Sequence, residues 1–191
     1  CIKGDNINIG IIYGGNSEES EVSVKSGKAI SNACEAIGHQ VTIFHISNNS
    51  IDNILLDLKK LDFVFLALHG VFGEDGSIQK ILDHNDIAYN GSQSNSSKNC
   101  FDKNFTKTIA KNNNILTPHF ILVNKRNFDV DDYNFKKSVI KPNKQGSSVG
   151  FSVIDNQNEI VSALDSALDY DTCALIEEYI EGREITVSIL G

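Results

Sequence analysis

Residues 139–150 read VIKPNKQGSSVG, and this stretch decides which fold the second half of the chain can adopt. A short apolar start with strand character leads to Lys141, and Pro142 then interrupts the ladder of backbone hydrogen bonds. A loop of glycine and serine follows, and an alternating strand resumes at residues 149–153. The sequence therefore predicts a β-hairpin over residues 139–154 with a long polar loop.

The chemistry of this loop suits an anion. Gly146 lets the backbone come close to a ligand, and consecutive N–H groups in such a loop form an anion-binding concavity. Ser147 and Ser148 add hydroxyl donors, while Lys141 supplies a point charge that suits phosphate. These features favour a flexible lid over a nucleotide triphosphate, and an ordinary hairpin with polar turn residues is the alternative at this point.

Bulk properties narrow the functional class. A length of 191 residues with 40% hydrophobic and 22% charged side chains is typical of a globular chain with one large or two small domains. A net charge of −8 without a basic tract argues against nucleic-acid binding, and no apolar run approaches the roughly 18 residues of a membrane span. The four cysteines form no CxxC pair, which argues against a zinc site and favours a reducing, cytoplasmic location.

The first ninety residues alternate between strand and helix patterns. This alternation predicts a Rossmann-like α/β domain, in which a parallel sheet is covered on both faces and binds ligands at the carboxyl ends of its strands. Strands are expected at 7–13, Gln40–Ile46, 62–68 and 87–89, and helices at 21–38, 51–61 and 76–85. The first helix is expected to have an apolar face formed by Val22, Ala29, Ala33 and Ile37.

The second half predicts an α+β arrangement with an antiparallel sheet. Residues 91–99 are small and polar, which indicates a domain boundary or the start of a helix. Before the hairpin, a helix is expected at 101–112 and a strand at Phe120–Val123; after it, a helix is expected at 158–168 and strands at 174–180 and 184–190.

Two turns in the first half carry candidate ligand groups. The first βα turn, GGNSEESEVS from Gly14, lacks the GxGxxG spacing of a dinucleotide site, which disfavours a nicotinamide-dependent oxidoreductase. Its glutamates suit a helix N-terminus, and their number suggests that one carboxylate faces the cleft to receive a cation such as an ammonium. The third strand ends in ALHGVFGEDG, which places His69 where ligands of such sheets bind.

Two further segments are ambiguous by themselves. Lys103 at the start of a helix has the pattern of a solvated lysine. The segment LIEEYIEGRE from Leu175 predicts either a hairpin with exposed acids or an extended edge whose backbone recognises adenine.

Taken in order, the segments GGNSEESEVS, ALHGVFGEDG, DK, VIKPNKQGSSVG and LIEEYIEGREITVSILG resemble the D-alanine–D-alanine ligase family of the ATP-grasp superfamily. The resemblance runs over residues 7–191. It implies an N-terminal substrate-binding domain at residues 1–95 and a central ATP-grasp subdomain at residues 96–191.

The resemblance also implies residue roles, none of which follows from spacing alone. Glu19 would hold the ammonium of the first D-alanine with His69 nearby, and Ser147 would bridge from the loop towards Glu19 and the substrates. Lys103 and Lys141 would bind the ATP phosphates, Glu177 would accept from the adenine amine, Tyr179 and Ile180 would line the base, and Glu184 would bind the ribose. Ser148 and Glu178 would also belong to the ATP site.

The activity implied is the ATP-dependent joining of two D-alanines through an acyl phosphate, for peptidoglycan precursor synthesis and hence cell-wall biogenesis and cell shape. The small-molecule partners would be ATP and D-alanine, with no nucleic acid and no membrane, and the family resemblance implies a homodimer through the N-terminal domain.

The family continues beyond Gly191 into a C-terminal subdomain that would carry the Mg²⁺ ligands, so no metal ligand is expected within residues 1–191. The polypeptide alone is therefore expected to be inactive or nearly so. Two alternatives are another ATP-grasp carboxylate–amine ligase, such as a D-alanine–D-lactate ligase, and a non-catalytic nucleotide- or amino-acid-binding module.

Overall fold

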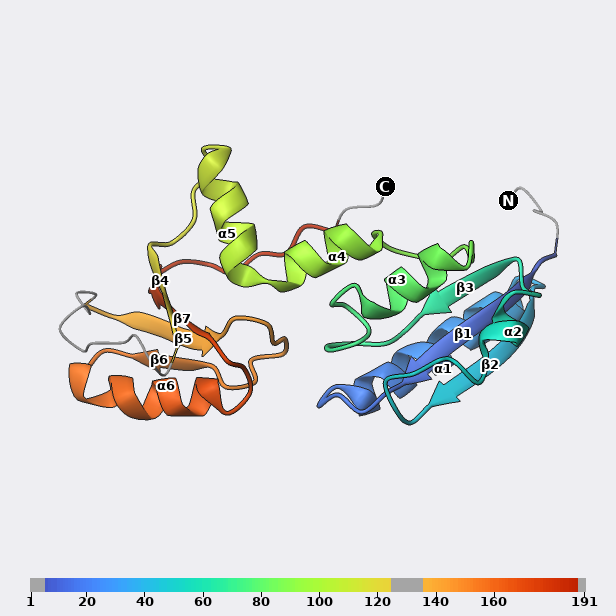
Figure 1. Ribbon diagram of the computed structural model, residues 1–191, viewed down its shortest axis with the longest axis horizontal. Coiled ribbons are helices and arrows are strands. Elements are labelled where there is room, and N and C mark those ends of the chain that lie inside the picture. The colour runs from blue at the N-terminus through green and yellow to red at the C-terminus, as the bar shows by residue number, and fades with distance from the viewer. Residues whose placement is uncertain (1–5, 125–135, 189–191) are drawn as a thin grey trace. The chain divides into compact units, whose positions relative to one another are not determined.

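A computed structural model of the chain describes residues 6–124 and 136–188. Contacts divide the chain into two units, residues 1–106 and 107–191, and the division lies inside helix α5 (Lys103–Asn112). Each unit consists of a small sheet with helices packed on it (Figure 1). The functional division between residues 95 and 96 stays a prediction.

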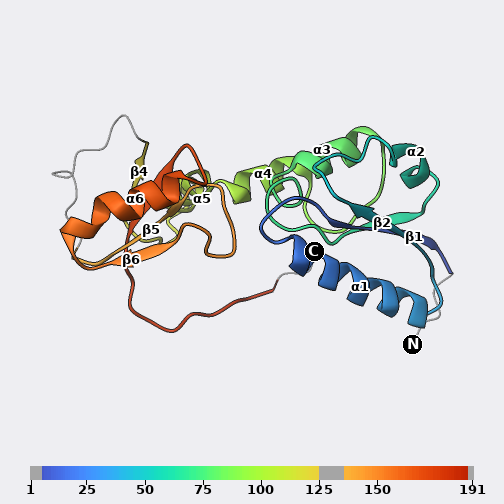
Figure 2. The same cartoon turned by 90° about the horizontal axis from the view of Figure 1, so that it is seen from below.

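The first unit contains a three-stranded parallel sheet with the order β2-β1-β3. Its strands are β1 (Asn8–Gly14), β2 (Gln40–Ile46) and β3 (Phe63–Leu66). Side chains of the central strand alternate between two cores, because Ile11 packs with Cys34 of helix α1 (Ser20–Ala36) and Ile12 packs with residues of helices α2 (Leu55–Leu58) and α3 (Ser77–His84). Figure 2 shows α1 on one side of the sheet and the other two helices on the opposite side. The predicted parallel sheet covered on both faces is confirmed.

Helix α1 packs on the sheet through small side chains. Its buried residues are Ser23, Gly27, Ser31 and Cys34. The predicted apolar face is wrong, because its members are all exposed: Val22, Ala29, Ala33 and Ile37. The physical reason is a close approach of helix and strand, since a Cβ atom at Gly27 would lie only 2.6 Å from Cγ of Tyr13 in β1.

Two predicted elements of the first unit are shorter than expected. The helix at residues 51–61 is reduced to the single turn of α2, because the Ser50 hydroxyl accepts from the Asp52 N–H at 3.2 Å and donates to its carboxylate at 2.9 Å, which holds a local turn instead. The expected strand at residues 87–89 is one isolated parallel bridge between Val64 and Tyr89. The polar segment at 91–99 contains the start of helix α4 (Ser94–Phe101).

The second unit contains a four-stranded antiparallel sheet with the order β4-β7-β5-β6. Its elements are β4 (Phe120–Val123), β5 (Ser138–Pro142), β6 (Ser152–Ile154), the 3₁₀ turn η2 (Gln157–Glu159), α6 (Ile160–Leu168) and β7 (Ala174–Glu178). Helix α6 packs its buried side chains on one face of this sheet, where Ile140 and Ile176 of the two central strands are completely buried. The predicted antiparallel sheet is confirmed.

The strand predicted at residues 184–190 is wrong over its described part. β7 ends at Glu178, and residues 179–188 form no strand, while residues 189–190 lie outside the described residues. The segment alternates as a strand would, but a strand needs a neighbour for its backbone hydrogen bonds, and the sheets of the described chain place none beside it. Ile185 and Val187 are accordingly 78% and 76% exposed.

Candidate functional site

The first βα turn is fixed by a buried serine. Gly14 and Gly15 have φ angles of +100° and +82°, which suit glycine and let the chain turn sharply after β1. The Ser23 hydroxyl accepts from the Gly14 N–H at 2.8 Å and donates to the carbonyl of Ala67 at 2.7 Å. One side chain of α1 therefore joins the carboxyl ends of β1 and β3, the two strands whose loops carry Glu19 and His69.

Glu19 and His69 lie in adjoining loops of the first unit. The Ser17 hydroxyl donates to the His69 carbonyl at 2.9 Å and so joins the two loops. Gly70 has a φ of +70°, and a Cβ atom there would lie 3.0 Å from Oε2 of Glu19. The carboxylate of Glu19 therefore rests against the backbone next to His69, and the structure brings together these two predicted substrate groups.

The ring of His69 is oriented by two neighbours. Its Nε2 lies 3.2 Å from the Ser26 hydroxyl of α1, and its Nδ1 lies 3.4 Å from Oε1 of Glu74. The other oxygen of Glu74 accepts from the Gly70 N–H at 3.1 Å, so the loop after β3 folds back on itself. This geometry explains why the HGVFGEDG segment contains several glycines and an acid five residues after the histidine.

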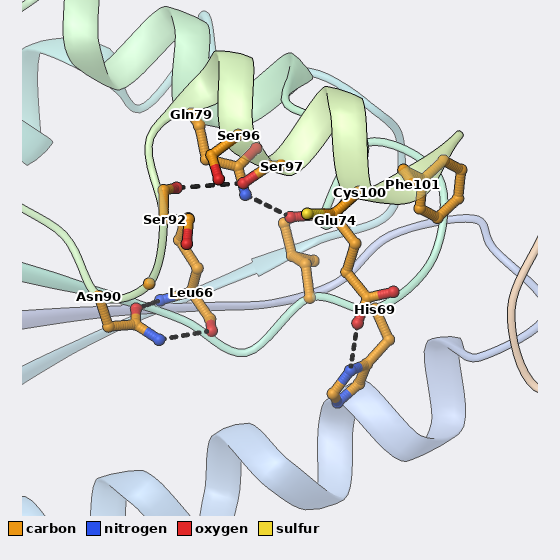
Figure 3. A pocket seen from close by; sticks show the side chains of 13 residues that line it. Leu66, His69, Glu74, Gln79, Asn90, Ser92, Ser96, Ser97, Cys100 and Phe101 are labelled. Carbon is orange, nitrogen blue, oxygen red and sulfur yellow. Dashed lines mark hydrogen bonds and ion pairs between the residues drawn. The ribbon is translucent and has the colours of Figure 1, made fainter. Parts of the chain in front are cut away.

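A cavity of about 480 Å³ lies beside this loop, between the end of β3 and the helices α3 and α4. Figure 3 shows the His69 ring directed away from it, towards α1, while Gln79, Ser96 and Ser97 line the opposite wall. The Gln79 side chain is buried and donates to the Gly73 carbonyl at 2.6 Å. The cavity is thus separate from the face of His69 that lies next to α1.

The predicted nucleotide residues of the second unit centre on a buried ion-pair cluster. Glu177 on β7 is 5% exposed, and its Oε2 lies 2.7 Å from Nζ of Lys141 on the neighbouring strand β5. The Nζ atom of Lys107 on α5 lies 3.2 Å from Oε1 of the same carboxylate. Lys141 and Glu177 are diagonal neighbours on the face of the sheet opposite α6, since Ile140 and Ile176 point towards that helix.

Lys107 is an unusual lysine. Its ammonium is nearly buried, donates to the Thr117 hydroxyl at 2.6 Å and the Pro118 carbonyl at 3.4 Å, and lies 5.1 Å from the centre of the Phe120 ring. Burial lowers the pKa of Lys107 from its ordinary value, and the charge of Glu177 acts in the opposite direction.

The backbone of the loop between β5 and β6 has unusual dihedral angles. Ser147 and Ser148 have φ angles of +46° and +60° and Gly150 has +64°, which delays the start of β6 to Ser152. The Lys144 N–H donates to the Asp171 carboxylate at 2.7 Å and so fastens the beginning of the loop. The predicted hairpin is confirmed, and its loop is longer than the alternating pattern of residues 149–153 indicated.

The remaining predicted residues are distributed over both units. Glu178 is half-buried at the end of β7, and the ring of Tyr179 stacks under the ammonium of Lys137 at 4.0 Å. Ile180 and Glu184 are exposed on the segment after β7. Lys103 is the first residue of α5 and belongs to the first unit, so its proximity to Lys141 stays a prediction.

Over residues 6–124 and 136–188, no group of three His, Cys, Asp or Glu side chains is arranged to hold a metal ion. Within the same ranges, every helix is too short or too polar to cross a membrane.

Two family models match the chain. One, described as D-ala D-ala ligase N-terminus, matches residues 51–92, and the other, described as D-ala D-ala ligase C-terminus, matches residues 111–191. Together they cover more than half of the chain. The first matches residues within the first unit, and the second matches residues within the second unit. The chain belongs to the D-alanine–D-alanine ligase family.

Individual members of this family are similar over nearly the whole chain. D-alanine–D-alanine ligase B of Clostridium perfringens is 42% identical over 188 residues, which are 96% of this chain and 61% of that protein. The crystal structure of D-alanine–D-alanine ligase from Bacillus anthracis is 34% identical with a TM-score of 0.83, over 92% of this chain and 58% of that one. A structure of the Bacillus anthracis ligase complexed with ATP gives 32% identity and a TM-score of 0.79, over 92% of this chain and 60% of that one. The chain spans about 60% of the length of the curated relatives it matches.

For this member of the D-alanine–D-alanine ligase family, sequence reasoning missed two residues that organise the site. Ser23 lies within the GGNSEESEVS segment, but nothing in the sequence indicates that its hydroxyl joins the Gly14 N–H to the Ala67 carbonyl. Lys107 had an indirect signal, because Glu177 continues the apolar run of β7 and a buried carboxylate requires a positive partner. The two sets of predicted residues, Glu19 with His69 and Lys141 with Glu177, lie in different units, and their meeting across one crevice stays a prediction.

Proposed function

We propose that the protein performs the ATP-dependent joining of two D-alanines, through an acyl phosphate. The observation that carries this proposal is the cluster of Lys107, Lys141 and Glu177 in the second unit, in which Lys141 lies on β5 just before the loop at residues 143–151. The family membership and the relative that was crystallised with ATP support the same assignment.

In the first unit, Glu19 would bind the ammonium of the first D-alanine. A carboxylate and an ammonium form a strong charge-assisted hydrogen bond, and the position of Glu19 against the Gly70 backbone supports this role. His69, held between Ser26 and Glu74, would assist from the adjoining loop. Residues 1–95 would thus form the substrate-binding domain.

Residues 96–191, which include the end of the first unit and the whole of the second, would form the central ATP-grasp subdomain. Lys103, Lys141 and Ser148 would bind phosphate oxygens, and Ser147 would reach towards Glu19 and the substrates. The adenine and ribose would be bound by the remaining predicted set: Glu177, Glu178, Tyr179, Ile180 and Glu184.

The reaction would proceed in two steps. A carboxylate oxygen of the first D-alanine attacks the γ-phosphorus, ADP leaves, and the amine of the second D-alanine then attacks the acyl carbonyl and expels phosphate. Positioning both amino acids could supply about 7–11 kcal/mol of the barrier reduction, against roughly 3–4 kcal/mol for a single electrostatic donor. The loop at residues 143–151 would exclude water, because a free acyl phosphate is hydrolysed.

Three further assignments belong to this proposal. The reaction would serve peptidoglycan precursor synthesis in the cytoplasm. Mg²⁺ would neutralise the transferring phosphoryl group, and the described residues offer no cluster of three ligands for it. A homodimer would form through the first unit, where the exposed apolar residues Val22, on α1, and Ile37, directly after it, offer a surface.

Calorimetric titration of the 191-residue chain with ATP and with D-alanine, each alone, tests the proposal. Both should bind, and Glu19→Gln should weaken D-alanine binding about 10- to 150-fold with little change for ATP, as expected for loss of a hydrogen bond to a charged group. Lys141→Met should do the reverse. Binding of neither ligand to the unaltered chain would overturn the proposal, and equal losses for both ligands in Glu19→Gln would make Glu19 a purely structural residue.

A further inference from the structure

One buried carboxylate in the second unit has two ammonium partners. Oε2 of Glu177 lies 2.7 Å from Lys141, and Oε1 lies 3.2 Å from Lys107. The side chain of Glu177 is 6% exposed, so its charge depends on these partners rather than on water. The cluster contains two ammonium groups and one carboxylate, so its net charge is positive.

The two lysines are anchored differently. Lys107 has an 11% exposed side chain and is also held by the Thr117 hydroxyl at 2.6 Å and the Pro118 carbonyl at 3.4 Å. The side chain of Lys141 is 25% exposed, and over the described residues its ion pair is with Glu177 alone. Lys107 is therefore the fixed partner of Glu177, and Lys141 is the one that can move.

Each carboxylate oxygen of Glu177 faces a lysine in this arrangement. Oε1 is completely buried, faces Lys107 and accepts no hydrogen bond of good geometry within the described structure, although the ammonium is close enough for a strong electrostatic contact. Oε2 is occupied by Lys141. A ligand amine that takes the position of the Lys141 ammonium on Oε2 displaces that lysine, and the buried carboxylate then keeps a positive partner only if Lys107 stays.

We infer that Lys107 is a positioning residue that retains and orients Glu177 while Lys141 moves from Glu177 to a nucleotide phosphate. The freed Oε2 then accepts a hydrogen bond from the 6-amino group of adenine, and no proton is transferred. The inference rests on the proposed ATP-dependent function and adds a coupling to it, because phosphate recognition by Lys141 and base recognition by Glu177 become parts of one exchange.

Removing either member of the fixed pair should affect the two recognitions differently. In Lys107→Met, Lys141 is the remaining counter-ion of a buried carboxylate and cannot leave, so the affinity for inorganic tripolyphosphate should fall about tenfold or more. In Glu177→Gln, Lys141 is no longer retained, so tripolyphosphate should bind as tightly as before or more tightly. The preference of Glu177→Gln for ATP over GTP should fall about tenfold or more, because its base acceptor is lost.

The double variant Lys107→Met/Glu177→Gln separates this exchange from a merely structural effect. Because the double variant has no buried carboxylate to retain Lys141, it should bind tripolyphosphate as tightly as Glu177→Gln does. It should also show the reduced preference of Glu177→Gln for ATP over GTP. Lys111→Met is the matched control, because Lys111 lies on the same helix and contacts the same Phe120 ring at 4.2 Å. It should change tripolyphosphate affinity by less than about threefold and leave the ATP-to-GTP ratio unchanged.

Calorimetry with ATP, GTP and tripolyphosphate on the 191-residue chain and these four variants gives the answer. Failure of the unaltered chain to bind ATP overturns the proposed function and the inference with it. ATP binding with full tripolyphosphate affinity in Lys107→Met overturns the inference alone. If Lys107→Met does not fold, Glu177→Gln decides, because weaker tripolyphosphate binding in that variant contradicts the exchange.

Discussion

Replacing Ser23 by alanine should destabilise the first unit far more than the loss of one hydroxyl suggests. The Ser23 side chain is completely buried, and its oxygen pairs with the Gly14 N–H at 2.8 Å and the Ala67 carbonyl at 2.7 Å. Alanine leaves both main-chain groups unpaired in a buried place, at about 1–3 kcal/mol each. The gain of roughly 0.5 kcal/mol in helix propensity offsets little of this cost. We therefore expect a loss of about 1.5–5.5 kcal/mol in the free energy of unfolding.

Urea unfolding followed by circular dichroism measures this loss. Ser31→Ala is the matched control, because Ser31 is buried on the same helix and takes no part in joining the two strands. It should change the free energy of unfolding by less than about 0.5 kcal/mol. The same Ser23→Ala substitution should also weaken D-alanine binding, since the turn before Glu19 loses its support. If the two alanine variants unfold at the same urea concentration, the reasoning about Ser23 is refuted.

Three other predictions concern packing and titration. Gly27→Ala should lower the free energy of unfolding by about 1–3 kcal/mol in the same urea assay, because the overlap with Tyr13 outweighs a helix-propensity gain of about 1 kcal/mol; a more stable variant would contradict the close approach of helix and strand. Burial and a hydrogen bond to an aspartate raise the pKa of Tyr89. The contribution of the Tyr89 hydroxyl to the free energy of unfolding is therefore present below pH 10.0 and is lost as the pH rises through the raised pKa. In a spectrophotometric titration, the last tyrosine to ionise should be missing from Tyr89→Phe. Burial raises the pKa of the Cys34 thiol, so iodoacetamide should modify the exposed Cys100 well before Cys34. Mass spectrometry measures the two rates, and equal rates would contradict the prediction.

The bounds of helices and strands were predicted best where a single run of apolar residues marked a strand. β2 and β4 have the expected bounds, because their apolar side chains are in register with buried neighbours on a sheet. The face of α1 was predicted wrongly, because periodicity counts apolar residues, whereas the close approach of Tyr13 and Gly27 requires small ones. The strand at residues 184–188 could not be judged from the segment alone, since a strand exists only with a neighbour.

The site residues show the same limit. Motif order identified Glu19 and His69, and the structure places them in adjoining loops. Ser23 and Lys107 act through atoms far away in the sequence, namely the backbone at Ala67 and the carboxylate at Glu177. Long-range pairing of this kind leaves no local pattern, and three-dimensional contacts are needed to detect it.

The contact between Gly70 and Glu19 also limits which variants of this chain can survive selection. Any other residue at position 70 would have to adopt the left-handed φ of +70° and would push its first side-chain carbon to 3.0 Å from the Glu19 carboxylate. One substitution at position 70 would thus both strain the backbone and displace the Glu19 carboxylate, to which we assign the ammonium of D-alanine. In a deep mutational scan, position 70 should tolerate few replacements, whereas Gly182, which has no atom within 4 Å of its added carbon, should accept many.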